Sequence, residues 1–365
     1  MLKKALSFGY NSLTNNEERR MKSYFIKRIL LIFVTAFIIL SLTFILMKLL
    51  PDTTPSGFPS QVQAYYIDQV HMGYAKDLTE ITPSLGDPIY TYTDNLSITH
   101  YIYKTPVMEQ YWNFLVNVFT QWNWGTSTRL SVNSSAIAII AERLPVTMSL
   151  NVISIVVAVP LGFLFGIIAA LKKNKLTDHV ISTLVMVLIS IPSFILITLL
   201  LLIFAYGTGW LPSQWPTANA DAATFAKAYI IPVCALSFGT IAGFTRYMRA
   251  ELCEVMSSDF LLLARTKGLT KTQCVVRHAL RNSMVPLVPM IIGQFIGILS
   301  GSMILENLYG IPGIGRLFTD ALTGRDYNVL MVDMAIFTLI GLGANLLVDL
   351  SYGIVDPRIR MGAKK

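Results

Sequence analysis

Six apolar stretches, each of about 20 residues, divide this sequence of 365 residues. An α-helix rises about 1.5 Å per residue, so each stretch is long enough to cross the roughly 30 Å hydrocarbon core of a bilayer. Charged residues make up only 14% of the chain, whereas soluble domains average about a quarter. We therefore predict an all-α polytopic membrane protein with six transmembrane helices at residues 29–50, 145–171, 180–206, 228–248, 286–305 and 330–352.

Residues 51–143 differ from the rest of the chain in charge and aromatic content. They hold eight acidic and four basic side chains, although the whole sequence has a net charge of +8, and they are rich in tyrosine. We expect a small external domain after the first helix. Its last part, residues 111–124, has helical apolar spacing and three tryptophans. This pattern predicts either a helix at the lipid interface, where indole rings are favoured, or a buried core helix of the same domain.

The distribution of basic residues predicts the orientation of the chain. With a cytoplasmic N-terminus, 21 of the 29 lysines and arginines lie in cytoplasmic segments. The positive-inside rule then favours both termini in the cytoplasm. We expect a cytoplasmic N-terminal segment at residues 1–28, the first helix at 29–50 and the external domain at 51–143. A five-helix core follows at residues 145–353 and contains a cytoplasmic loop at 249–285. Residues 354–365 form a cytoplasmic tail.

A polar, basic segment, residues 256–286, separates the fourth apolar stretch from the fifth. Ser258 or Asp259 can cap a first short helix here, and Gly268 suits the left-handed position that ends such a helix. The helix would carry the apolar residues Phe260, Leu261, Leu263 and Ala264. Because it is too short to be stable alone, it needs a surface to lie against.

A second helix is predicted to follow directly. Thr270 and Gln273 have the spacing of a capping box, and the helix should end near Pro286 because the residue before a proline disfavours the helical region. The segment is therefore predicted to be a helix, a tight turn and a helix, which we call the basic hairpin. Its basic residues could meet anionic lipid headgroups, or the hairpin could lie in the groove of a protein partner.

The motifs of the basic hairpin resemble the Glu-Ala-Ala loop of ABC-importer permeases, and more narrowly that of the oligopeptide, dipeptide and nickel permease family. The similar residues are Asp259-Phe260-Leu261, Ala264-Arg265-x-Lys267-Gly268-Leu269, Arg277-His278-Ala279-Leu280-Arg281-Asn282 and Pro286. Two positions depart from the family pattern, which usually has a basic residue and Thr where this chain has Leu262 and Leu263.

The resemblance extends over most of the chain from Met21 onwards. It includes Glu142-Arg143-Leu144-Pro145, Ser190-x-Pro192-Ser193-Phe194, Asn345-Leu346-Leu347-Val348-Asp349 and Asp356-Pro357-Arg358-Ile359-Arg360. A further family segment is matched by Glu306, Pro312, Gly313 and Gly315, followed by Asp326-Tyr327, and we expect it to shape the external mouth.

The resemblance implies an ABC-importer type I permease fold in the inner membrane. Such a subunit forms half of a path for oligopeptides or dipeptides, beside a second homologous permease subunit, with two ATPase subunits that bind ATP and Mg and an extracytoplasmic substrate-binding protein. Nickel chelates and other small solutes are alternative substrates within the same class. The hairpin would sit in a cleft of the ATPase through Asp259, Phe260, Ala264, Arg265, Lys267, Gly268, Arg277, His278 and Arg281.

The sequence predicts a transport subunit and not an enzyme. It contains no Gly-x-x-x-x-Gly-Lys-[Ser/Thr] motif, so any ATP hydrolysis would belong to a partner. The four histidines lack metal-ligand spacing, and the basic residues flank apolar stretches, which argues for the bilayer and against nucleic acid as a partner. Polar side chains that could line a path are Ser190, Ser193, Gln294, Ser300 and Asn345.

Two other classes of function remain possible from the sequence. One is an ATP-independent secondary carrier, although such carriers normally place ionisable residues near the midplane, and the apolar stretches contain almost none. The other is a membrane sensor or scaffold, which predicts no solute flux. Neither explains the basic hairpin.

Overall fold

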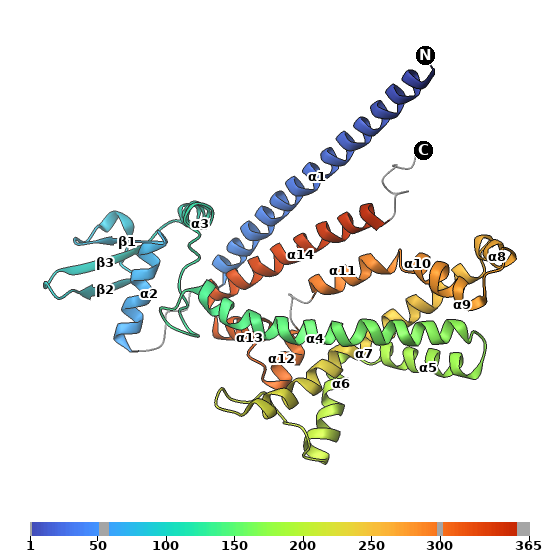
Figure 1. Ribbon diagram of the computed structural model, residues 1–365. Coiled ribbons are helices and arrows are strands. Elements are labelled where there is room, and N and C mark those ends of the chain that lie inside the picture. The colour runs from blue at the N-terminus through green and yellow to red at the C-terminus, as the bar shows by residue number, and fades with distance from the viewer. Residues whose placement is uncertain (1, 51–57, 298–301, 356–365) are drawn as a thin grey trace. The chain divides into compact units, whose positions relative to one another are not determined.

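The computed structural model describes residues 2–50, 58–297 and 302–355, and most of them are helical (Figure 1). The chain forms two compact units. The first comprises Met1–Phe33, Val146–Pro312 and Ile340–Lys365, and the second comprises Val34–Pro145 and Gly313–Leu339. Three long helices contribute residues to both units: α1 (Leu2–Leu49), α4 (Ala136–Leu171) and α14 (Tyr327–Val355).

The first unit is built on the close packing of α4 against α7 (Ala222–Met256). A Cβ atom on Gly162 would lie 2.6 Å from Cβ of Phe244, and one on Gly166 would lie 2.6 Å from Cβ of Met248. The absence of side chains at these two positions lets the helix backbones approach, as is common where membrane helices pack. The remaining helices of this unit are α5 (Leu176–Ser190), α6 (Ser193–Leu200), α8 (Asp259–Thr266), α9 (Lys271–Cys274), α10 (Leu280–Ser283), α11 (Leu287–Gly297) and α12 (Met303–Tyr309).

Four helical segments of the described residues are long and apolar enough to cross a membrane: Ile26–Leu49, Ala136–Leu171, Ala222–Met256 and Tyr327–Ser351. A bent pair, Leu176–Ser190 with Ser193–Gly207, makes a fifth if it counts as one span. The prediction of a helical polytopic membrane protein is thus confirmed for the apolar segments, although a small sheet is present elsewhere, and the count of six is not confirmed. The predicted span at 286–305 is represented by α11, which has 11 residues, and residues 298–301 lie outside the described part.

The bent pair differs from the single continuous span predicted at 180–206. The two halves meet at an angle of 101° around Pro192. Proline lacks a backbone donor and drives the preceding residue out of the helical region, and Ile191 accordingly has φ −91° and ψ 118°. Beyond α6 the chain continues as a seven-residue π-helix, Leu201–Gly207, which the hydrophobic pattern did not predict.

The second unit contains a small α/β domain formed by α2 (Pro59–His71) and three short strands. The strands β1 (Ala75–Leu78), β2 (Tyr90–Thr93) and β3 (Thr99–Lys104) form an antiparallel sheet in the order β1-β3-β2. The aromatic residues supply its core: the rings of Tyr66 and Tyr90 stack with centroids 4.4 Å apart, beside the fully buried Ile102. The sequence analysis predicted a domain here but not these strands.

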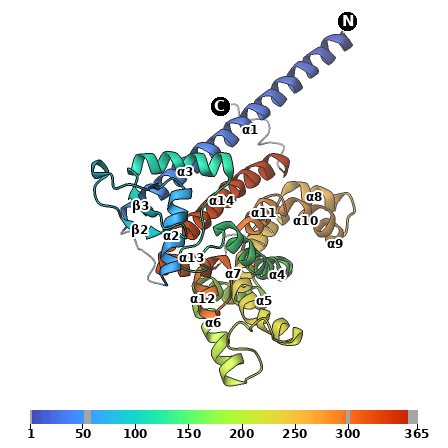
Figure 2. The ribbon, with the colours of Figure 1, turned by 90° about the vertical axis from the view of Figure 1, so that its left-hand side faces the viewer.

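The helix α3 (Val107–Gln121) follows the sheet and lies beside the C-terminal half of α1, as both views show (Figures 1 and 2). Its inner face is buried, and the ring of Phe114 stacks on Phe44 of α1 with centroids 4.8 Å apart. Its other face exposes Trp112 and Phe119, and Trp122, which follows the helix directly, is exposed as well. The helix therefore combines features of the two alternatives: one face belongs to a core and the other presents large apolar rings.

Candidate functional site

The first helix of the basic hairpin is α8, which is separated from the end of α7 by two residues. Ser258 occupies the N-cap position, but its hydroxyl donates to the carbonyl of Val255 at 2.5 Å and makes no capping hydrogen bond to α8. Ser258 therefore marks the start of the helix, as predicted, while its side chain stabilises the end of α7. Asp259 lies in the first turn of α8, where a carboxylate interacts favourably with the helix dipole.

The turn that ends α8 is formed as the sequence predicted. Gly268 has φ +91°, a backbone conformation that residues other than glycine rarely adopt. Its N–H donates to Arg265 O at 3.0 Å, and the next N–H, of Leu269, donates to Ala264 O at 3.3 Å. This pair of bonds is a Schellman motif, which satisfies carbonyls at the helix end and fixes the direction in which the chain leaves.

The second helix opens with the predicted capping box. The N–H of Gln273 donates to Thr270 Oγ1 at 3.3 Å, and the N–H of Thr270 donates to Gln273 Oε1 at 3.0 Å. The helix runs through α9, a five-residue π-helix at Val275–Ala279 and α10, and it ends before Pro286. The π-helix was not predicted; such turns are often found at functional sites.

The hairpin has an inner apolar face that packs on its own unit. Leu261, Cys274 and Ala279 are buried in a cluster that includes Leu252 of α7 and Leu287 of α11. Ala264 is half-buried against the same cluster. Of the apolar residues that the sequence placed on the first helix, Leu261 is thus occupied by internal packing and is not available to a partner.

The outer face of the hairpin combines apolar and basic side chains. Phe260, Leu262 and Leu263 are 44%, 56% and 57% exposed, and Val276 in the second half of the hairpin is exposed as well. The two leucines are the positions at which the sequence departs from the family pattern. The charged and imidazole groups predicted for this site are all exposed, namely Asp259, Arg265, Lys267, Arg277, His278 and Arg281, as is Lys271. We call these exposed residues together the coupling face.

A buried ion pair, which the sequence analysis did not identify, holds the helices behind the hairpin. Asp178 of α5 is 1% exposed and accepts two hydrogen bonds from Arg249 of α7, at 2.5 Å from Nε and 2.7 Å from Nη2. It also accepts from the N–H of Asn174 at 2.9 Å, in the turn between α4 and α5. The signal in the sequence is a single carboxylate at the start of an apolar stretch and an arginine at the end of another, since such residues normally pair.

A second buried link joins α4 to α12 in the same unit. The hydroxyl of Thr147 donates to Glu306 Oε1 at 2.9 Å, and both side chains are buried. Glu306 belongs to the segment that we expected at the external mouth. Its carboxylate stabilises helix packing in this structure.

The residues predicted to line a path are not gathered at one point. Ser190 ends α5 and Ser193 begins α6, so both flank the bend at Pro192, and both are exposed. Gln294 and Asn345 are exposed on α11 and α14. Ser300 lies outside the described residues. The role of these five residues stays a prediction.

The fold and the site together define a class of protein: a multi-pass helical membrane protein that presents a preformed basic hairpin. Comparison with known proteins supports this assignment. The profile of the family described as "Binding-protein-dependent transport system inner membrane component" matches residues 162–361. The dipeptide transport system permease protein DppB of Lactococcus lactis subsp. cremoris is 35% identical over 93% of this chain and 100% of that protein. The oligopeptide transport system permease protein OppB of Haemophilus influenzae is 30% identical over the same shares.

The chain therefore belongs to the family of binding-protein-dependent transport system inner membrane components. This confirms the resemblance to ABC-importer permeases of the oligopeptide and dipeptide type and the permease fold that it implied. The family is one of multi-pass inner-membrane subunits that work with an ATPase and a substrate-binding protein.

Proposed function

We propose that this chain forms half of the membrane path of an ATP-driven importer for short peptides. The relatives named above are dipeptide and oligopeptide permease proteins, and they align along their whole length. A second homologous permease would supply the other half of the path, two ATPase subunits would bind ATP and Mg, and an extracytoplasmic binding protein would deliver the peptide. Both termini lie in the cytoplasm in this proposal, because that orientation places most basic residues there.

The observation that carries the proposal is the coupling face. Protein interfaces typically have an apolar centre with a polar rim, and arginine is enriched in them. The coupling face has this composition: the exposed apolar residues Phe260, Leu262 and Leu263 lie on the same hairpin as the basic side chains. The Schellman turn and the capping box fix its shape before any partner binds, which lowers the ordering cost of association.

The buried Asp178–Arg249 pair provides a route for coupling. It connects α5 and the α4–α5 turn to α7, and α7 leads directly into the hairpin. A displacement of the hairpin by a closing ATPase would therefore act on α7 and, through the ion pair, on α5. The polar residues Ser190, Ser193, Gln294, Ser300 and Asn345 remain our candidates for the path.

The proposal is tested by uptake into proteoliposomes. The full complex, with its ATPases and binding protein, should import a labelled tripeptide only when ATP is present on the ATPase side. Uptake that persists without ATP and follows an ion gradient would identify a secondary carrier and refute the proposal.

The coupling face is tested by replacing its two unusual leucines. Half-burying a leucine side chain contributes roughly 1 kcal/mol, so Leu262→Ser with Leu263→Ser should weaken ATPase association at least tenfold. Leu176→Ser is the matched control, since Leu176 is 79% exposed in the same unit but lies outside the hairpin. Equal association of the double variant and the control would show that the leucines do not contact the ATPase.

A further inference from the structure

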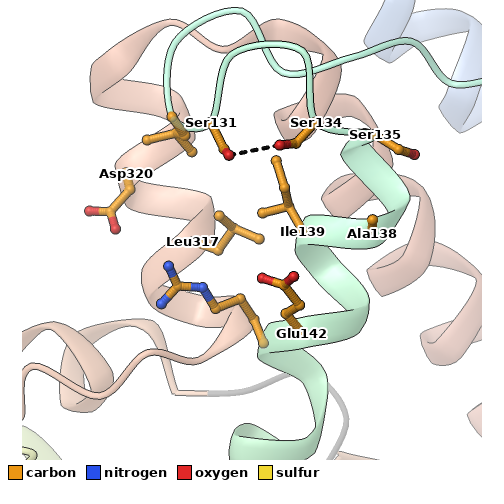
Figure 3. A pocket seen from close by; sticks show the side chains of 10 residues that line it. Ser131, Ser134, Ser135, Ala138, Ile139, Glu142, Leu317 and Asp320 are labelled. Carbon is orange, nitrogen blue, oxygen red and sulfur yellow. Dashed lines mark hydrogen bonds between the residues drawn. The ribbon is translucent and has the colours of Figure 1, made fainter. Parts of the chain in front are cut away.

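A hollow of about 520 Å³ lies in the second unit, between the first turns of α4 and the helix α13 (Ile314–Gly324), under the loop that precedes α4 (Figure 3). Its volume falls within the range of about 300–1,000 Å³ that is usual for small-molecule sites. The polar residues of its lining are Ser131, Ser134, Ser135, Glu142, Arg143 and Asp320. None of these residues was assigned to the path or to the coupling face.

The walls of this hollow are fixed by buried contacts. Asp326 is fully buried, and its Oδ2 accepts from the hydroxyl of Ser127 at 2.6 Å and from the N–H groups of Arg129 and Leu130 at 3.0 and 3.1 Å. These bonds hold the loop above the hollow. Ile139 and Leu317, from α4 and α13, belong to the buried core of the unit. The hollow is therefore a preformed feature and does not depend on a flexible loop.

The two charged side chains that α4 contributes to the hollow are not neutralised by any residue that the structure describes. Glu142 and Arg143 make no ion pair or side-chain hydrogen bond with any residue in the described part of the structure. Figure 3 shows the Glu142 carboxylate in the space between α4 and α13. Asp320 adds a second carboxylate, which lies 3.6 Å from Nε of Arg316. The hydroxyls of Ser131 and Ser134 are 2.8 Å apart and can still accept or donate further hydrogen bonds.

A ligand that complements this lining carries both signs of charge. A purely cationic or purely anionic ligand would desolvate a neighbouring charge without pairing it, which is unfavourable. A short peptide with free ends is a zwitterion: its ammonium pairs with carboxylates, and its carboxylate matches the fork of a guanidinium. Its amide groups can bond to the serine hydroxyls.

We propose that this hollow is a binding site for the charged ends of a short peptide, with Glu142 on the ammonium and Arg143 on the carboxylate. The inference rests on the proposed peptide-import function and adds the residues that recognise the substrate class. The hollow lies on the external side of the membrane in the orientation proposed above, where a peptide would arrive from the binding protein.

The test measures binding of trialanine to the full permease–ATPase complex in nanodiscs, without binding protein. N-acetyl-trialanine lacks the ammonium and trialanine amide lacks the carboxylate, so the two ends can be examined separately. We expect wild type to bind each capped peptide about fivefold more weakly than trialanine, which is the upper end for an exposed ion pair.

Each variant should remove the preference for one end only. Glu142→Gln should bind trialanine and N-acetyl-trialanine alike while still discriminating against the amide, and Arg143→Gln should do the reverse. Arg143→Lys keeps the positive charge but loses the planar guanidinium that can bind a carboxylate through two hydrogen bonds. It should give an intermediate preference for trialanine over trialanine amide. Glu80→Gln is the matched control, because Glu80 is exposed in the same unit but outside the hollow, and it should behave as wild type.

Three outcomes would overturn the proposal. Equal binding of all three peptides by wild type and variants would show that the hollow does not recognise the charged ends of a peptide. A loss of binding-protein affinity in the variants, with or without peptide, would make it a docking surface for that protein. Failure of the variants to assemble with the second permease would make it a subunit interface. If wild type instead shows no ATP-driven uptake, the proposed function fails, whatever the hollow binds.

Discussion

Replacing Gly268 by valine tests the geometry of the coupling face at a single position. An added Cβ at Gly268 has nothing within 4 Å, so the substitution creates no steric overlap and acts only through the backbone, whose φ is +91°. A residue with a Cβ in a left-handed conformation costs roughly 1–2 kcal/mol, and β-branched side chains tolerate it least. That cost corresponds to roughly a 5–30-fold fall in the population of the correctly turned hairpin.

The assay compares ATP hydrolysis stimulated by peptide-loaded binding protein in Gly268→Val and wild type. We expect stimulation and ATPase co-purification to fall by roughly this factor, while membrane insertion persists because the turn lies outside the apolar spans. Gly268→Asn is the matched control, since asparagine tolerates left-handed backbone, and it should retain most of the coupling. Normal coupling in Gly268→Val would refute the placement of the contact on this turn.

Three further predictions concern other parts of the chain. Asp178→Ala should lower the free energy of unfolding, measured by thermal unfolding in detergent, by about 2 kcal/mol. This is less than the cost of breaking a fully buried ion pair, because the Arg249 side chain is 32% exposed. The hydrogen bond to Asp77 raises the pKa of His100, so its stabilisation of the α/β domain is present below pH 6.5 and is lost as the pH rises through the folded pKa. Hydrogen exchange of the β3 amides, corrected for the intrinsic rate, should accelerate as the pH rises from 6.5 through the folded pKa of His100. Trp112 is 67% exposed on α3, and brominated lipids should quench its fluorescence.

Each of these predictions has a control and a contradicting result. Arg316→Gln removes an exposed i,i+4 pair and should change the unfolding free energy by less than about 0.5 kcal/mol; an equal effect of Asp178→Ala would contradict the buried-pair account. In His100→Gln the pH dependence of exchange should disappear, and its persistence would assign it to another group. The buried Trp124 should escape quenching, and quenching of both rings alike would argue against an interfacial α3.

The hairpin illustrates what the sequence can predict. Its turn and capping box follow from local rules, because glycine at a left-handed position and the Thr270–Gln273 spacing depend on few residues, and both were found where expected. The hydroxyl of Ser258 was not predicted correctly, since a nearby carbonyl of α7 competes for it. The inward orientation of Leu261 also depends on packing with helices that are distant in sequence.

Features that depend on residues distant in sequence could largely not be predicted from the sequence. Asp178 and Arg249 are 71 residues apart, and only the packing of α5 on α7 brings them together. Asp326 organises a loop almost 200 residues away, so the hollow beneath that loop had no local signal. The bend at Pro192 is an intermediate case: the proline was noted, but its effect depends on whether neighbouring helices preserve a continuous span.

The most direct test of the account is to purify this chain, tagged, from its native host in mild detergent and to identify the proteins that accompany it. The account predicts a second permease-like chain together with P-loop ATPases, and loss of the ATPases alone in the Leu262→Ser, Leu263→Ser variant. A stable, monodisperse chain recovered without partners would contradict it and would reduce the coupling face to a surface that rests on lipid.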